Sequence, residues 1–165
     1  MKAVPNIRPA VEKDIQSITE IYNHAIIHTT ATFDTETKTL ENRLEWFRQH
    51  SPTHSIIVAE YEGEIAGWAS LSKWSDKMAY DSSVENSLYV AEKYRGKGFG
   101  KKMLERLIEE GRKNGFHTII ARISDGNDIS LKMHYDLGFE NTGTLKEVGI
   151  KFGKLIDVHL LQIYL

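Results

Sequence analysis

Apolar residues follow two different spacings along the chain, one typical of helices and one typical of strands. From Ile15 to Ile26 they recur at i, i+3, i+4 and i+7, which predicts an amphipathic helix with Asp14 placed to cap or to charge its first turn. Runs rich in β-branched residues predict strands instead. The predicted helices are 15–26, one from 39 that ends at Pro52, one from 99 that ends at 114–115, and 129–137; the predicted strands are 7–10, 55–61, 65–74, 84–90, 117–123, a run from 139, and 158–164.

The order of these elements, β-αα-ββ-β-α-β-α-β-β, predicts the fold class. Strands and helices mixed in this way favour a mixed α/β (α+β) fold, with a mostly antiparallel sheet, one central βαβ unit and helices on both sides. The 165 residues are enough for one complete hydrophobic core, and no linker rich in Gly, Ser or Pro interrupts them. We therefore expect residues 1–165 to form a single domain.

Charge and cysteine content exclude several classes of function. The 21 Lys and Arg residues nearly balance the 23 Asp and Glu, a formal net charge of −2, which argues against a general nucleic-acid binder. The chain has no Cys, which excludes disulfides, thiol catalysis and zinc sites built on thiolates. No apolar stretch has the length of a signal peptide or a membrane span. We expect a cytoplasmic protein without nucleic-acid or membrane partners.

A glycine-rich loop lies immediately before the third predicted helix. In the segment 95–102, RGKGFGKK, glycine occupies alternate positions among basic residues. Glycines let a ligand approach the backbone closely, and a helix N-terminus carries partial positive charge, so the segment suits a pyrophosphate. The spacing excludes both the Walker loop and the dinucleotide fingerprint. The alternative is a glycine-rich turn followed by a solvated lysine face.

The loop resembles the acetyl-CoA pyrophosphate loop of the GNAT acetyltransferases, which reads Arg or Gln, two variable residues, Gly, one variable residue, then Gly or Ala. Asn127 and the segment 134–139, HYDLGF, resemble the second motif of that superfamily. The segments IYNHAII with TTATFD, AYDSSVENSLYV, GNDISLKMH and GIKFGKLIDVHLLQIYL narrow the resemblance to the phosphinothricin acetyltransferase group, over essentially the whole chain. The resemblance implies the GNAT fold, acetyl-CoA as co-substrate, and direct acetylation of the α-amino group of glutamate or methionine analogues.

The resemblance also implies where acetyl-CoA would bind. In the family, backbone groups of one strand hold the pantetheine arm where two parallel strands splay apart, much as an added strand would pair with a sheet edge. The loop holds the pyrophosphate, and an asparagine contacts the pantetheine end. Carried onto this chain, the cofactor site comprises Leu88, Tyr89, Val90, Arg95, Gly96, Lys97, Gly98, Phe99, Gly100, Lys101 and Asn127.

Two side chains are predicted to move protons. An aliphatic amine is mostly protonated at neutral pH and must lose a proton before it attacks a thioester. The resemblance assigns the base to Glu85, which acts directly or through a water and which alternation places on the same strand face as Ser87 and Tyr89. His134 stands where many GNAT enzymes have a tyrosine that protonates the leaving thiolate, and an imidazole suits that role. The alternatives are an ion-paired glutamate and a hydrogen-bonded helix histidine.

The acceptor side is predicted from Phe33, Tyr80 and Glu85. Phe33 either walls the acceptor pocket or plugs the core, and Lys77 either pairs with a substrate carboxylate or lies on the surface. No metal site is expected, because the paired histidines (His24 and His28, His50 and His54) lack the other residues of a known metal motif. The resemblance also implies a homodimer and a role in herbicide or antibiotic resistance. The rival interpretations are acetylation of a polyamine or a protein N-terminus, and a non-catalytic acyl-CoA-binding sensor.

Overall fold

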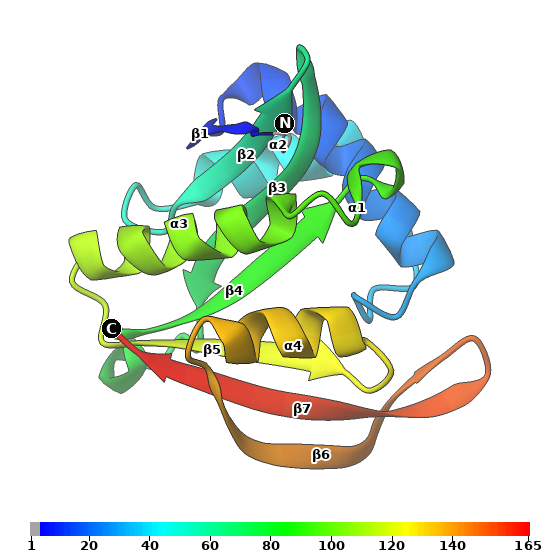
Figure 1. Cartoon of the computed structure of the whole chain (residues 1–165), viewed down its shortest axis with the longest axis vertical. Helices are drawn as coiled ribbons and strands as arrows, with labels where there is room; N and C mark the ends of the chain where they lie inside the picture. Colours follow the sequence, from blue (N-terminus) through cyan, green and yellow to red (C-terminus); the bar gives the residue numbers. More distant parts are fainter. Residues whose placement is uncertain (1–3) are drawn as a thin grey trace.

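The computed structural model describes residues 4–165. Over this range the chain forms one seven-stranded sheet, in the order β1-β2-β3-β4-β5-β7-β6, with helices on both faces (Figure 1). The predicted fold class and the predicted order of elements are therefore confirmed. The strands are β1 (Asn6–Pro9), β2 (Ile56–Tyr61), β3 (Glu64–Lys73), β4 (Ser83–Val90), β5 (Thr118–Ser124), β6 (Glu140–Lys151) and β7 (Lys154–Tyr164). The α-helices are α1 (Ile15–His28), α2 (Leu40–Gln49), α3 (Phe99–Lys113) and α4 (Asp128–Asp136), and 3-10 turns cover Glu12–Asp14, Met78–Tyr80 and Glu92–Tyr94.

The unit β4-α3-β5 is the predicted βαβ unit, and β4 and β5 form the parallel pair of the sheet. Their pairing is short, because it runs only from Ser83 opposite Thr118 to Glu85 opposite Ile120. Every other neighbouring pair of strands in residues 4–165 is antiparallel. Beyond Glu85 the two parallel strands diverge, which opens the sheet near its centre.

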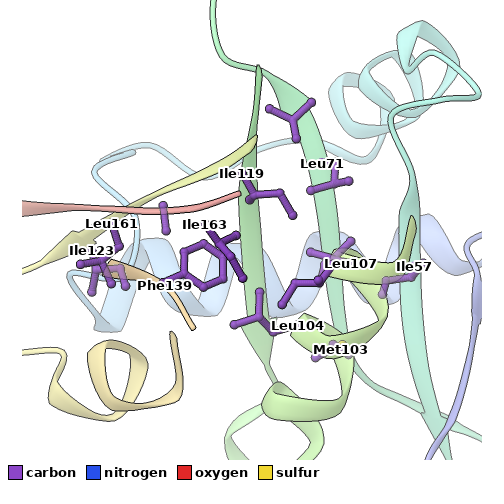
Figure 2. Packing of buried hydrophobic residues seen from close by; sticks show 14 of the residues in the cluster. Ile57, Leu71, Met103, Leu104, Leu107, Ile119, Ile123, Phe139, Leu161 and Ile163 are labelled. Atoms are coloured by element: carbon purple, nitrogen blue, oxygen red, sulfur yellow. The ribbon is translucent and has the colours of Figure 1, made fainter. Parts of the chain in front are cut away.

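Each face of the sheet carries its own hydrophobic core. On the face covered by α3 and α4, fully buried side chains of helix and strands interdigitate, as Figure 2 shows. On the other face Ile15 and Ile18 of α1 pack against Val58 and Trp68, and α2 adds partly buried apolar side chains. Burying each such side chain contributes about 1.5–3 kcal/mol, so both helix layers are fixed firmly to the sheet. The principal residues of the first core are Ile57, Leu71, Met103, Leu104, Leu107, Ile119, Ile123, Phe139, Leu161 and Ile163.

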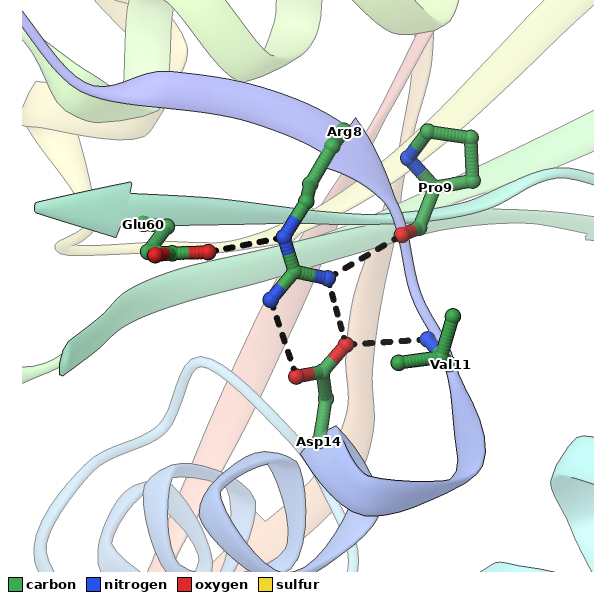
Figure 3. Close-up of polar contacts among 5 residues, drawn as sticks. All are labelled: Arg8, Pro9, Val11, Asp14 and Glu60. Carbon is green, nitrogen blue, oxygen red and sulfur yellow. Dashed lines mark hydrogen bonds and ion pairs between the residues drawn. The ribbon is translucent and has the colours of Figure 1, made fainter. Parts of the chain in front are cut away.

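The sequence suggested that Asp14 caps α1, but its side chain makes no capping hydrogen bond to that helix. It lies in the preceding 3-10 turn with only 4% of its surface exposed, and its carboxylate accepts two hydrogen bonds from Arg8, at 2.7 and 3.0 Å (Figure 3). A third comes from the Val11 N–H at 2.9 Å. Burial alone would raise the pKa of Asp14, but these hydrogen bonds outweigh it and hold the pKa below its usual value. Asp14 therefore joins β1 to the start of α1.

Most strand boundaries lie within one residue of the prediction, and two of the differences have a clear structural cause. The β2–β3 turn consists of Glu62 and Gly63, both with positive φ, so Glu64 already belongs to β3. At the end of the chain β7 begins at Lys154 instead of Val158, because residues 154–156 pair with β6. The result is a long β6–β7 hairpin that extends beyond the body of the sheet (Figure 1). No helix among residues 4–165 is both long and apolar enough to cross a membrane.

Candidate functional site

A cavity of about 560 Å³ lies where β4 and β5 separate. Its walls come from α1, the segment 30–34, β3, β4, β5, α4 and the β6–β7 hairpin. Six of the residues predicted from the sequence meet there: Phe33, Glu85, Leu88, Tyr89, Asn127 and His134.

Glu85 and His134 reach the cavity from opposite faces of the sheet. Alternation along β4 directs Val84 and Leu88 toward the core under α3 and α4, whereas Tyr89 packs in the core under α1. Glu85 shares the α1 face with Tyr89, and His134 comes from α4 on the other side. The gap between β4 and β5 connects the two faces, so a ligand placed in it would have a carboxylate on one side and an imidazole on the other.

The Glu85 carboxylate forms a bidentate ion pair with Arg122 of β5. Nε of Arg122 donates to Oε1 and Nη2 donates to Oε2, each at 2.6 Å. These hydrogen bonds raise the pKa of Arg122 above its ordinary value. The ion-paired glutamate considered from the sequence is therefore present, and it lies inside the cavity. The sequence had not pointed to Arg122, although an arginine within the apolar run 118–123 was a visible signal.

His134 is buried, with 3% of its surface exposed, and both ring nitrogens have partners. Nδ1 lies 2.8 Å from the Ser130 carbonyl oxygen, which can only accept, so Nδ1 carries the proton. Nε2 then accepts from the Asn86 side-chain amide at 3.0 Å. Burial lowers the pKa of His134, and the hydrogen bond to Ser130 only partly opposes this. The resting side chain is a neutral imidazole, and Asn86 Oδ1 is buried without a partner among the described residues.

The glycine-rich loop has the backbone geometry that an anion needs. Gly96 and Gly98 have φ of +75° and +82°, and α3 begins directly after Gly98. Within the described chain, the N–H groups of residues 96–101 donate to no protein acceptor, and the first helical hydrogen bond is from Lys102 to Gly98. Six successive donors, at a helix N-terminus, therefore remain available to a pyrophosphate.

Side chains of the loop are not all available to a ligand. Phe99 is 1% exposed and packs with Tyr94, so only its backbone can face a cofactor. Lys97 holds its ammonium group over the Tyr94 ring, 5.1 Å from the centroid. Arg95 donates from Nε to the Val90 carbonyl at 3.3 Å, which ties the loop to the end of β4.

One backbone edge of β4 has no strand beside it past Glu85. On its other edge, residues 84–90 pair with β3, up to Val90 opposite Gly67. On the β5 side the pairing ends at Glu85, so among residues 4–165 no strand pairs with that edge of residues 86–90. An extended ligand with amide groups can pair with such an edge. Leu88 and Tyr89, two of the residues predicted to hold the pantetheine arm, also line the cavity.

A second cavity, of about 790 Å³, lies beyond the far end of β4. Val90 lines it, together with the start of α1 and the β2–β3 turn. Its lining includes two ion pairs, Arg8 with Glu60 at 2.8 Å and Lys93 with Glu64. Neither Glu85 nor His134, the two residues predicted to move protons, lines it.

Phe33 lies in the cavity wall and is fixed there by the β6–β7 hairpin. A Cβ added to Gly149 would meet the Phe33 ring at 2.1 to 2.9 Å, so the ring lies directly on the Gly149 backbone. Lys151, 5% exposed, donates to the Thr32 carbonyl at 2.8 Å and holds the same segment. Of the two interpretations of Phe33, the structure matches the pocket wall, since the side chain is 37% exposed.

Tyr80 and Lys77 do not belong to this cavity. Both lie at the 3-10 turn before β4, outside the set of lining residues, and Tyr80 is 45% exposed. Two residues that the sequence had not indicated, Tyr22 and Asp34, do line it. The Tyr22 hydroxyl donates to Asp34 Oδ2 at 2.5 Å, and burial together with this contact raises the pKa of Tyr22 to about 12.

The histidine pairs show no metal-binding arrangement. His24 and His28 lie with ring centroids 4.5 Å apart on α1, and His50 donates from Nε2 to the Leu71 carbonyl at 3.0 Å. In the described part of the chain, no three His, Cys, Asp or Glu side chains are grouped to hold a metal ion.

Comparison with known proteins connects this geometry to a family. Residues 16–139 match the Acetyltransferase (GNAT) family. An L-methionine sulfoximine/L-methionine sulfone acetyltransferase of Salmonella typhimurium is 39% identical over 96% of this chain and 94% of its own. A phosphinothricin acetyltransferase of Sinorhizobium meliloti, crystallised with acetyl-CoA, has a TM-score of 0.95 at 33% identity, over 100% of this chain and 89% of that one. A ribosomal-protein-alanine N-acetyltransferase of Brucella melitensis has a TM-score of 0.95 at 39% identity, over 97% and 99%.

These comparisons confirm the resemblance seen in the loop and in the 127–139 segment. They also agree with the cofactor prediction, since a neighbour with the same fold was crystallised with acetyl-CoA. The names of these three proteins differ in the acceptor, which is an amino-acid analogue in two cases and a protein alanine in the third. With the family profile covering most of its length and relatives above 30% identity covering nearly all of it, the chain belongs to the GNAT acetyltransferase family.

Proposed function

We propose that this protein transfers the acetyl group of acetyl-CoA directly to the α-amino group of a small amino-acid-like acceptor, such as phosphinothricin or methionine sulfoximine. The observation that carries the proposal is the cavity between β4 and β5, where Glu85 and His134 face the same gap from opposite sides. The names of the Salmonella and Sinorhizobium relatives support this class of acceptor.

The groups proposed to hold acetyl-CoA are mostly backbone groups. The free N–H groups of residues 96–101 would bind the pyrophosphate, with Arg95, Lys97 and Lys101 adding positive charge. The unpaired edge of residues 86–90 would bind the amides of the pantetheine arm, and Asn127 lines the cavity beside it. Bound there, acetyl-CoA supplies an acetyl thioester, the electrophile that an amine attacks.

Glu85 is the proposed base. An ammonium group in the gap would give its proton to the Glu85 carboxylate, directly or through a water, and the free amine would then be nucleophilic. Arg122 holds both carboxylate oxygens, so the carboxylate has a fixed orientation before an acceptor arrives. The lone pairs that do not face Arg122 remain free to accept the proton.

His134 is the proposed donor to the leaving thiolate, and that role requires a proton on Nε2. In the resting state Nε2 accepts from Asn86, so the Asn86 amide would have to rotate and offer Oδ1, which has no partner now. With one proton taken up from solvent, the imidazolium would donate from Nδ1 to Ser130 and from Nε2 to Asn86. It would then give the Nε2 proton to the sulfur of the leaving thiolate, which departs as the free thiol, and the ring would return to the neutral imidazole. Burial lowers the pKa of His134, which makes this charged state minor at neutral pH and the proton easy to lose.

A protein N-terminus is the second candidate acceptor. The name of the Brucella neighbour favours it. The cavity weighs against it, because segment 30–34 and the hairpin at Leu145 and Val148 also line the site and leave a volume suited to a small molecule. The homodimer and the resistance role belong to the proposal through the family resemblance, and the cytoplasmic location belongs to it through the sequence analysis.

The test is release of free thiol from acetyl-CoA with a panel of amino acids, methionine sulfoximine, phosphinothricin, spermidine and alanine-initiated peptides. Turnover should be highest with the amino-acid analogues. Glu85→Gln should lower kcat strongly while acetyl-CoA affinity stays near that of the wild type, whereas Glu92→Gln, an exposed glutamate outside the site, should change neither. Equal turnover in wild type and Glu85→Gln would remove Glu85 from the mechanism, and preference for peptides would establish the second candidate.

A further inference from the structure

Arg122 differs from every other residue of the catalytic cavity in its charge. Among residues 4–165 it is the one Lys or Arg side chain that lines the cavity, and Asp34 and Glu85 are the two carboxylates that do so. Asp34 already accepts from Tyr22 and pairs with Lys38 at 3.5 Å. The Arg122 guanidinium is therefore the one Lys or Arg group of the described residues that an anionic ligand would meet inside the cavity.

Only one edge of the Arg122 guanidinium is in use. A guanidinium has five N–H donors, and the contacts with Glu85 take one on Nε and one on Nη2. Within the described chain Nη1 donates to no protein group, so three donors remain. The side chain lines the cavity and is 56% exposed, against 17% for Glu85, so a ligand can reach it. The Trp74 ring, 5.6 Å from Cζ, packs beside it and limits how far the guanidinium can swing.

We propose that Arg122 is a specificity-determining residue whose free edge binds the carboxylate of the acceptor while its other edge holds Glu85. In an α-amino acid, the amine and the carboxylate are attached to the same carbon. One guanidinium between the two carboxylates would therefore place the amine beside Glu85, where its proton must go. Planar two-point binding of carboxylates is the geometry that arginine provides and lysine does not.

This inference rests on the proposed function and makes it narrower. The acceptor class becomes α-amino acids and their analogues with a free α-carboxylate. Polyamines, α-amides and peptide N-termini lack that group and would leave the Nη1 edge unoccupied.

The experiment combines two enzymes with two acceptors. Wild type and Arg122→Met are assayed with methionine sulfoximine and with its α-carboxamide, which keeps the amine and the side chain but not the charge. Arg122→Met removes the charge-assisted hydrogen bonds to the acceptor carboxylate, so kcat/KM for the carboxylate should fall roughly 10- to 100-fold, mainly because KM rises. The carboxamide loses only the effect of Arg122 on the orientation of Glu85, so its kcat/KM should fall by a clearly smaller factor than that of the carboxylate. Arg122→Lys keeps the positive charge but loses the planar two-point geometry of the guanidinium, so its kcat/KM for the carboxylate should lie between those of the wild type and Arg122→Met.

The carboxamide also serves as an internal control for Glu85. If Arg122 acted only by orienting Glu85, both acceptors would lose activity by the same factor, and the proposal would be wrong. Retained kcat/KM for the carboxylate in Arg122→Met would also overturn it. Calorimetric titration of the same two acceptors into CoA-bound enzyme gives an answer without turnover. If the wild type binds the carboxylate selectively, loses that selectivity in Arg122→Met and yet shows no turnover, the proposed function is refuted and this inference is supported. If the wild type binds both acceptors equally well, the inference is refuted.

Discussion

Gly98 gives the sharpest test of how the glycine-rich loop is built. Its φ of +82° and ψ of 6° lie in the left-handed region, directly before the first residue of α3. A Cβ added there would meet no atom within 4 Å, so Gly98→Ala introduces backbone strain without a clash. For an L-residue that conformation costs about 1–2 kcal/mol.

Gly100→Ala is the matched control. Gly100 has ordinary helical geometry, and an added Cβ would meet Met133 Sδ at 3.3 Å and Leu88 Cδ2 at 3.5 Å, contacts that a flexible thioether can accommodate. Both substitutions remove the same freedom from the unfolded chain, so that contribution cancels in the comparison. Gly98→Ala should therefore have a free energy of unfolding about 1–2 kcal/mol below that of Gly100→Ala.

Urea unfolding followed by circular dichroism measures this difference, and titration calorimetry measures acetyl-CoA affinity in parallel. We expect Gly98→Ala to bind acetyl-CoA more weakly, because the strained loop no longer directs its N–H groups together, and Gly100→Ala to bind like the wild type. Equal free energies of unfolding, or a less stable Gly100→Ala, would refute the reasoning about the loop.

Three further predictions concern the structure around the site. Asp14→Asn breaks a buried charge pair and should lower the free energy of unfolding by about 2–3 kcal/mol. Glu60→Gln removes a half-exposed partner of the same arginine and should lower it by less than about 1 kcal/mol. Similar losses for the two variants in urea unfolding would contradict this. Because the pKa of His134 in the folded protein lies below its unfolded value of 6.5, its stabilising contribution is complete above pH 6.5 and is lost as the pH falls toward the folded pKa. The free energy of unfolding of His134→Gln should therefore depend less on pH between pH 7.5 and 5 than that of the wild type. The same pH dependence in both proteins would refute the neutral imidazole. Gly149→Ala should displace the Phe33 ring and lower acceptor kcat/KM, with activity partly restored by adding Phe33→Ala; a fully active Gly149→Ala would contradict the packing.

The periodic elements were predictable because their physical causes are local. The apolar stripe of α1 and the β-branched run of β5 appear directly in the sequence, and so does the helix N-terminus at Gly98. The role of Asp14 was not predictable, because it depends on Arg8 across a turn and on burial under α1, neither of which a spacing rule contains.

The candidate site shows the same division. The loop was predicted from its glycine spacing before a helix, and Glu85 and His134 were predicted from the family resemblance of the segments that contain them. Arg122, Tyr22 and Asn86 were missed because their importance comes from which strand or helix lies opposite them, and only the divergence of β4 from β5 brings Arg122 to Glu85. Alternation placed Glu85 on the right strand face but could not show that an arginine shares it.

The most direct test of the account is mass spectrometry of the acceptor after incubation of the enzyme with acetyl-CoA and methionine sulfoximine. We predict one added acetyl group on the α-amine, formed in step with release of free thiol, and almost none with Glu85→Gln. An unmodified amino-acid acceptor together with acetylated spermidine or an acetylated peptide would contradict the account, and so would full product formation by Glu85→Gln.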